Sequence, residues 1–250
     1  MALARCFELN PRLTFCVALI ACLACAVTIP GAFAQDFSSS GGYVRDSEIL
    51  RVQDKAEELF ERGDYKRAHF IYLNELAPIG DKYAQYMVGF MNMTGLGVRE
   101  DPVLASAWYR LAAERHTAPF IAVRDDMNRR LDTIDMERSD EIYLRLRRDF
   151  SDIAVRMREV REDYELLNDG PTGSRTSRSS SPVIIVKPRE GSSMSMDAYR
   201  GEVTRRMQKH LNFIARTLEI EQVNADSISS TRIGDLEEQV MTFVARVDDR

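Results

Sequence analysis

The stretch AQYMVGFMNMTGLGVREDPVLASAWYRLAAE, residues 84–114, carries the clearest structural signal in the chain. It holds two runs of apolar residues at helical spacing, and Gly95-Leu96-Gly97 lies between them. Glycine adopts positive φ at little cost, so the first helix is expected to end at this turn. Asp101-Pro102 then combines a capping oxygen with the fixed φ of proline, which is typical of a helix start. The stretch therefore predicts a helical hairpin.

Upstream of this hairpin, residues 47–80 predict a second pair of helices. Gly63 is expected to end the first helix of this pair, and Asp64 to cap the next one. That helix should continue to Ala77 and end at Pro78 and Gly80, after which Asp81 can start the first helix of the hairpin already described.

Downstream, the pattern predicts a helix near 118–131 and then one long helix over 136–168. The long helix carries an apolar seam with spacings of three and four residues: Ile142, Leu146, Phe150, Ile153, Met157, Val160, Tyr164 and Leu167. Such a seam has two interpretations. It can pack against the preceding helices as a cap, or it can form a coiled coil with a second copy of the chain.

The C-terminal third divides into a polar segment and a helical segment. Residues 169–198 are rich in Ser, Gly and Pro and predict a linker, which includes a short β-prone run at 183–186. Residues 199–250 predict two amphipathic helices. A helical hairpin of this size rarely folds alone, so we expect it to dock on the first domain or on a second copy.

The N-terminus has the pattern of a secretory signal peptide. Residues 1–34 contain Arg5 and Arg12, an uncharged apolar run and a small-residue cleavage motif, so we expect cleavage between Ala34 and Gln35. Residues 35–46 would then form a flexible leader, and the mature protein would be periplasmic or secreted. Two alternatives stay open: an uncleaved membrane anchor, and a lipid anchor at Cys22, which lies in a lipoprotein-like sequence.

Composition excludes several classes of function. The chain has 250 residues and a formal charge of −5, which argues against a dedicated nucleic-acid binder. All four cysteines, Cys6, Cys16, Cys22 and Cys25, lie in the expected signal peptide. The mature chain therefore has neither a disulfide scaffold nor a cysteine-ligated metal site. Its three histidines are far apart, and no nucleophile or phosphate-binding motif is present, so we predict no catalytic residue, no metal and no cofactor.

The hairpin at 84–114 closely resembles a Sel-one-like repeat, a relative of the tetratricopeptide repeat, and residues 48–80 resemble a degenerate unit of the same type. Alanines, glycines, an aspartate and a tryptophan recur at many fixed spacings. The resemblance implies that residues 47–168 form an all-α, short α-solenoid. It assigns a structural role to Gly63, Asp64, Tyr65, Ala68, Ala84, Gly89, Gly95, Gly97, Asp101, Ala105, Trp108 and Ala112. Asn92 and His116-Thr117 depart from the pattern, and the latter suggests that the array ends there.

Repeats of this type resemble scaffolds that hold peptides or protein surfaces in a groove. The resemblance thus implies an exported, non-catalytic protein-interaction scaffold with a protein partner in the cell envelope. The candidate groove residues are Tyr72, Tyr83, Tyr86, Tyr109 and Arg110. Two alternatives are an envelope enzyme that acts on cell-wall or β-lactam substrates and a structural homodimer formed through the long helix.

Overall fold

The computed structural model describes residues 43–168 and 196–246, and all regular structure in these ranges is helical. The predicted signal peptide with its cleavage site, Cys22 and the β-prone run at 183–186 lie outside the described residues. Two boundaries differ from the predictions. The first helix begins at Tyr43, inside the expected leader, and the first C-terminal helix begins at Met196, inside the expected linker.

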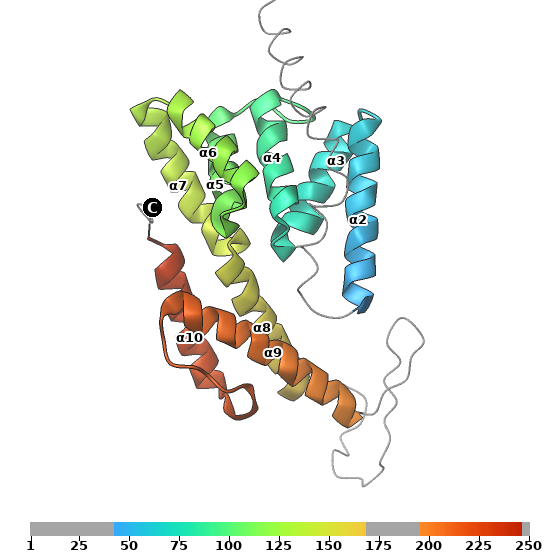
Figure 1. The fold of residues 1–250 in the computed structure, drawn as a ribbon, viewed down its shortest axis with the longest axis vertical. Coiled ribbons are helices and arrows are strands. Elements are labelled where there is room, and N and C mark those ends of the chain that lie inside the picture. The colour runs from blue at the N-terminus through green and yellow to red at the C-terminus, as the bar shows by residue number, and fades with distance from the viewer. Residues whose placement is uncertain (1–42, 169–195, 247–250) are drawn as a thin grey trace, which may run out of the picture. The chain divides into compact units, whose positions relative to one another are not determined.

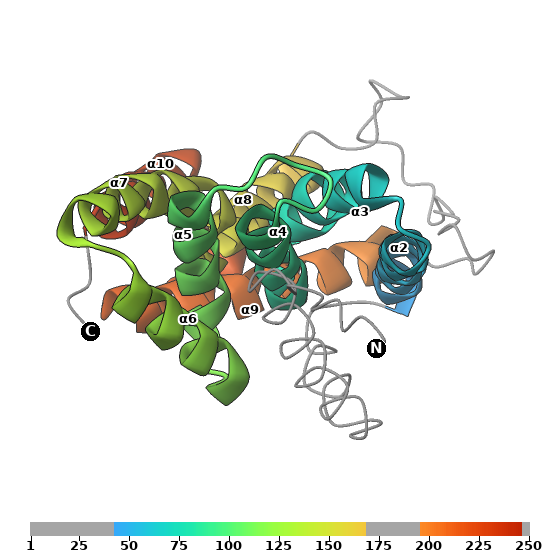
Figure 2. The same ribbon diagram turned by 90° about the horizontal axis from the view of Figure 1, so that it is seen from above.

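The six α-helices from α2 to α7 follow one another along the chain, and the first four form two successive hairpins (Figure 1). Their bounds are α2 (Tyr43–Glu61) and α3 (Tyr65–Ile71), α4 (Lys82–Thr94) and α5 (Pro102–Ala112), and α6 (Ala118–Arg130) and α7 (Thr133–Phe150). Within each hairpin the two helices lie side by side, and α6 and α7 each pack against α5 (Figure 2). This arrangement is a short helical solenoid, as predicted.

The helix-start signals around the central hairpin are confirmed. An Asp81 carboxylate oxygen accepts a hydrogen bond from the Ala84 amide at 3.0 Å, and Asp101 caps α5 through the Leu104 amide at 2.9 Å. Gly95 ends α4 with φ +71°. The predicted cap at Asp64 is wrong. Its side chain accepts no capping bond, because it lies 3.4 Å from the Arg67 guanidinium instead.

The segment that was expected to form one α-helix up to Ala77 contains three types of helix. After α3, a π-helical turn covers Tyr72–Leu76, and a 3-10 turn covers Ala77–Ile79 before Gly80 at φ +81°. Pro78 lacks an amide hydrogen and its ring crowds the carbonyl four residues earlier, so a regular α-helix cannot run through it. Tyr72, the first residue of the π-helical turn, lies four residues after the buried Ala68 and is itself buried in the core.

The prediction of one long helix over 136–168 is wrong. The segment consists of α7 and α8 (Asp152–Asn168), which are separated by Ser151 in an extended conformation with ψ 154°. The Ser151 hydroxyl accepts a hydrogen bond from the Ala154 amide at 3.3 Å and so caps α8. The apolar seam continues across the break without losing its spacing. The periodicity therefore gave no sign of the break.

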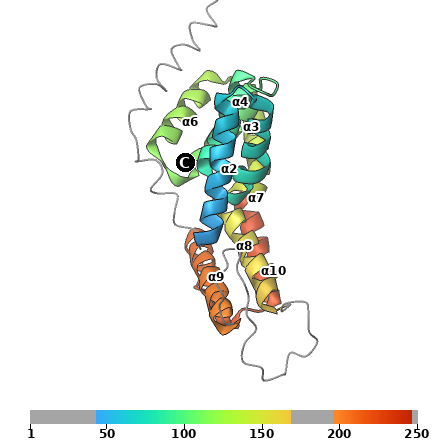
Figure 3. The ribbon, with the colours of Figure 1, turned by 90° about the vertical axis from the view of Figure 1, so that its right-hand side faces the viewer.

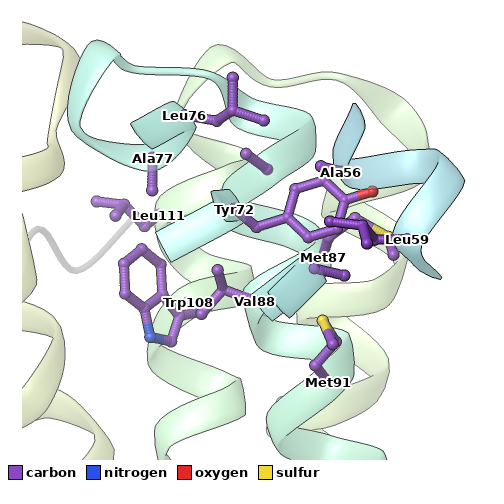
Figure 4. Packing of buried hydrophobic residues seen from close by; sticks show 12 residues of the cluster. Ala56, Leu59, Tyr72, Leu76, Ala77, Met87, Val88, Met91, Trp108 and Leu111 are labelled. Atoms are coloured by element: carbon purple, nitrogen blue, oxygen red, sulfur yellow. The ribbon is translucent and has the colours of Figure 1, made fainter. Parts of the chain in front are cut away.

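The seam packs inside the chain and joins two hydrophobic cores. Leu146 and Phe150 contact the first core, which α2 to α5 build around Trp108 and Leu111 (Figure 4). Ile153, Met157 and Val160 belong to the second core, which they share with the C-terminal helices. The core-packing interpretation of the seam is thus confirmed, although five of its eight residues pack with later helices, not with preceding ones.

The C-terminal hairpin consists of α9 (Met196–Leu218) and α10 (Ser230–Val244), and both helices pack against α8 (Figure 3). Docking on the first domain was one of the two arrangements that the sequence allowed. Arg206 of α9 forms a salt bridge with the buried Asp163 of α8, and Arg161 of α8 forms another with Glu237 of α10. In the described parts of the chain, no helix combines the length and the apolar character needed to cross a membrane.

Candidate interaction surface

Two tyrosines of α4 reach solvent on a face that α4 shares with α2. The Tyr83 side chain is 38% exposed, and its hydroxyl donates a hydrogen bond to Glu57 of α2 at 3.4 Å. Tyr86 is half-buried, with its ring centroid 6.4 Å from that of Tyr83. Leu50, two helical turns before Glu57, is 57% exposed. We call Leu50, Glu57, Glu61, Tyr83 and Tyr86 the α2–α4 surface.

The α2–α4 surface rests on a rigid set of aromatic contacts. The Tyr86 ring stacks on Phe120 of α6 at 5.4 Å and contacts Tyr109 of α5 at 5.6 Å. The Tyr83 ring meets Tyr72 edge to face at 6.4 Å. Aromatic pairs at these distances add stabilisation beyond the area that they bury. The exposed tyrosines are therefore held in position by three other helices.

Close packing of α4 on α5 is what brings these rings together. Ala84, Ala105 and Ala112 are fully buried at the helix interface. Gly89 lies directly under Tyr109, because a Cβ added at Gly89 would lie 2.9 Å from the tyrosine ring. Small residues let two helices approach closely, so large neighbours can pack over the backbone.

The turn between α4 and α5 also joins the hairpin to the one before it. Gly97 has φ +76°, and a Cβ added there would lie 2.5 Å from the carbonyl carbon of Tyr65, at the start of α3. No other residue fits this contact without displacing the backbone. Gly97 thus lets the turn between α4 and α5 lie directly against the start of α3.

Comparison with known families identifies this hairpin. The family model described as the Sel1 repeat matches residues 82–116. This segment is a Sel1 repeat. The match confirms the predicted resemblance and places its bounds at the start of α4 and just after α5. Comparisons with curated proteins and with solved structures find no match.

The two departures from the Sel1 pattern have local explanations. Asn92, where the family usually has an aromatic residue, is only 5% exposed. The side-chain amide of Asn92 donates a hydrogen bond to the Val88 carbonyl at 2.8 Å. The backbone carbonyl of Asn92 accepts a hydrogen bond from the Asp101 backbone amide, also at 2.8 Å. His116 adopts φ +55° and ends the Sel1 repeat, after which Thr117 precedes α6.

The five predicted groove residues do not form one groove. Tyr83 and Tyr86 lie on the α2–α4 surface. Tyr72 and Tyr109 are only 1% and 5% exposed, so assigning them to a groove was wrong. Tyr72 lies four residues after the buried Ala68 and so on the buried face of α3, and the space above Gly89 accepts Tyr109.

Arg110 lies elsewhere, in a cavity of about 680 Å³ that the sequence did not reveal. Its guanidinium pairs with Asp140 and lies 4.2 Å from the centre of the Tyr143 ring. Arg147, Phe213 and Phe243 also line this cavity, which forms where α9 and α10 approach α5, α6 and α7. Because docking of the C-terminal hairpin creates the cavity, no local pattern could have predicted it.

A buried ionic network anchors the Sel1 repeat to α8. Lys82, which is 1% exposed, places its Nζ 2.7 Å from Glu114 and 3.4 Å from Asp152. Arg115 donates two hydrogen bonds of 2.8 Å to Asp152. Burial raises the pKa of Asp152, but the hydrogen bonds and charges of Arg115 and Lys82 together outweigh it, so that pKa is lowered. Asp152 therefore stays ionised, and its partners hold the start of α8 in place.

Within residues 43–168 and 196–246, no group of three or more His, Asp or Glu side chains is arranged to hold a metal ion. The carboxylates near the Sel1 repeat belong to the network just described or to exposed helix surfaces. The feature that best suits recognition is the α2–α4 surface, where exposed aromatic rings are fixed by buried ones.

Proposed function

We propose that the chain is an exported, non-catalytic scaffold that binds a partner protein in the cell envelope through its α2–α4 surface. The observation that carries this proposal is the Sel1 repeat whose first helix presents Tyr83 and Tyr86 to solvent. Sel1 repeats generally mediate contacts between proteins. Partly exposed tyrosines held by a packed second layer are typical of the residues that dominate binding energy at protein interfaces.

Two further features support this surface over other parts of the chain. Leu50 adds an exposed apolar side chain on α2, two helical turns before Glu57, whereas the exposed Phe70 and Ile134 lie on other helices. The surface is also preorganised, because Tyr86 is fixed by Phe120 and Tyr109. A preorganised surface loses less conformational entropy on binding.

Capture of the partner from envelope fractions of the producing cell tests the proposal. The mature chain is used as bait, beside Tyr83→Ala and the matched control Phe70→Ala, which removes an exposed aromatic ring from α3. We expect the wild type and Phe70→Ala to retain the same partner and Tyr83→Ala to lose it. Circular dichroism should show that all three proteins are folded. Equal capture by all three would contradict the proposal.

Export is tested separately by mass spectrometry of the mature N-terminus. Cleavage of residues 1–34 yields a chain that begins at Gln35. A lipid-modified N-terminal Cys22 would instead show the anchored form, and an intact Met1 would contradict cleavage.

A further inference from the structure

The α2–α4 surface carries carboxylates that no described Lys or Arg neutralises. Among the residues that the structure describes, no Lys or Arg pairs with Glu57 or Glu61, and both side chains are exposed. Glu58, their neighbour on the same helix, behaves differently. It lies 3.1 Å from Lys55 and 2.5 Å from Arg62. The charge of Glu58 is therefore neutralised within α2, whereas no described Lys or Arg neutralises Glu57 or Glu61.

The negative charge of these carboxylates also affects the pKa values of the neighbouring tyrosines. Burial raises the pKa of Tyr83, and the charges of Glu57 and Asp81 raise it further. Burial likewise raises the pKa of Tyr72, to which Glu57, Asp81 and Glu61 also contribute. The Asp81 carboxylate already accepts hydrogen bonds from Gln53 and from the Ala84 amide. The Glu61 carboxylate accepts no hydrogen bond from a described residue and Glu57 accepts only the one from Tyr83, so both keep acceptor positions for an incoming group.

A buried polar atom next to this surface also lacks a partner. The Tyr72 hydroxyl is buried between α2 and α4, and no described residue forms a hydrogen bond with it. Its ring meets Tyr83 edge to face, and its hydroxyl points toward Ala56 and Leu59 of α2 (Figure 4). Because the Tyr72 side chain is only 1% exposed, this hydroxyl belongs to the buried layer that contacts Tyr83 and does not itself meet a partner.

Carboxylates that lie beside aromatic rings can bind cations. An arginine or lysine can lie on a tyrosine ring while its charge is neutralised by a nearby carboxylate. We infer that the α2–α4 surface binds a basic segment of the partner protein, with an Arg or Lys side chain on Tyr83 beside Glu57 and Glu61 and an apolar neighbour on Leu50. This inference rests on the proposed function and adds the chemistry of the partner.

Binding of two labelled peptides to the mature chain tests the inference. One peptide is Gly-Leu-Arg-Gly-Leu-Arg-Gly, and the other has glutamate in place of both arginines. Fluorescence anisotropy should show that the arginine peptide binds at least about tenfold more tightly, and that added salt weakens its binding. The double variant Glu57→Gln/Glu61→Gln should weaken that binding about tenfold, whereas the matched control Glu58→Gln should change it less than about twofold.

The possible outcomes separate this inference from the proposed function. Equal binding of the two peptides, equal effects of the double variant and the control, or no binding of the arginine peptide at about 1 mM would overturn the basic-segment inference. If Tyr83→Ala nevertheless abolishes capture of the partner, the scaffold proposal stands and only its charge preference is wrong. If Tyr83→Ala also leaves capture unchanged, both are overturned.

Discussion

The two hydrophobic cores are built in different ways. The first core, formed by α2 to α5, brings helices together through alanines and glycines and fills the remaining space with Trp108 and Leu111. The second core, formed by α8 to α10, uses branched and long apolar side chains such as Ile214, Leu236 and Val240 at regular spacing. Small residues at fixed spacings make a recognisable motif, whereas an amphipathic stripe identifies a helix without identifying its neighbour.

Removal of a large side chain from each core is expected to produce the largest effects. Leu111→Ala and Leu211→Ala each empty a site that is at most 1% exposed, so each should lower the free energy of unfolding by about 2–5 kcal/mol. The two variants should differ in the order of unfolding. Trp108, the single tryptophan, reports the first core by fluorescence, while circular dichroism reports all helices.

In Leu211→Ala, helix content should fall in urea before the Trp108 signal changes, because α9 and α10 are attached mainly through α8. In Leu111→Ala, the Trp108 fluorescence should change at the same urea concentration as the helix content or at a lower one. Coincident transitions in Leu211→Ala would show that the two cores unfold as one unit, and would contradict the division drawn here.

The glycine turn of the first core should be the next most sensitive site. Gly97→Ala combines positive φ with a clash against the Tyr65 backbone, so it should cost about 3 kcal/mol or more. Gly63→Ala is the matched control, because Gly63 has a similar φ of +81° but no atom within 4 Å of an added Cβ. It should cost about 1 kcal/mol. Equal losses in urea unfolding would show that the turn does not pack on α3.

Removal of the helix caps should change the stability of the Sel1 repeat and of the hairpin before it by different, smaller amounts. Asp101→Ala removes the acceptor for the Leu104 amide and should cost about 1 kcal/mol. Asp64→Ala removes no capping bond and should change the stability by less than about 0.5 kcal/mol. Urea unfolding of both variants measures the difference, and a larger loss for Asp64→Ala would contradict the assigned capping geometry.

The second core should lose stability in mild acid. His210 of α9 is 4% exposed and lies near Glu159, Arg156 and Asp163 of α8 and Arg206 of its own helix. Burial lowers its pKa, with Arg156 acting in the same direction and Glu159 against it. The unfolded chain therefore binds this proton more readily than the folded chain, so stability falls as pH drops below the ordinary histidine pKa of about 6.5.

Replacement of His210 by glutamine should remove this part of the pH dependence. Urea unfolding at several pH values below neutrality, for His210→Gln and for the wild type, measures it. Identical slopes of stability against pH for the two proteins would show that His210 does not oppose protonation in the folded chain.

Local features of the fold could be predicted from the sequence, and features that join distant segments could not. Asp101 and Gly95 act within a few residues of themselves, so their roles follow from the sequence. Ser151 interrupts a seam whose spacing stays regular, and its capping role depends on α8 being held by Arg115 and Lys82. Arg115 and Lys82 lie far from α8 along the chain, so the spacing of residues within α7 and α8 could not predict these contacts.

The candidate surface was only partly predictable for the same reason. Tyr83 and Tyr86 could be chosen because they lie on a helix of the recognised repeat. Tyr109 was assigned to the same surface wrongly, since its burial depends on the space above Gly89 on another helix. The contribution of Glu57 depends on the approach of α2 to α4, which brings Glu57 within reach of the Tyr83 hydroxyl and which no local pattern predicts.

The central claim is that a partner protein contacts the α2–α4 surface. Site-specific photo-crosslinking in the producing cell tests it most directly, with a photoreactive amino acid in place of Leu50 or Tyr83 and, as controls, of Phe70 or Ile134. All four positions are exposed, but only the first two belong to the surface. We predict one common crosslinked protein from positions 50 and 83 and none from positions 70 and 134. Crosslinks of equal yield from all four positions, or from the controls alone, would contradict the account.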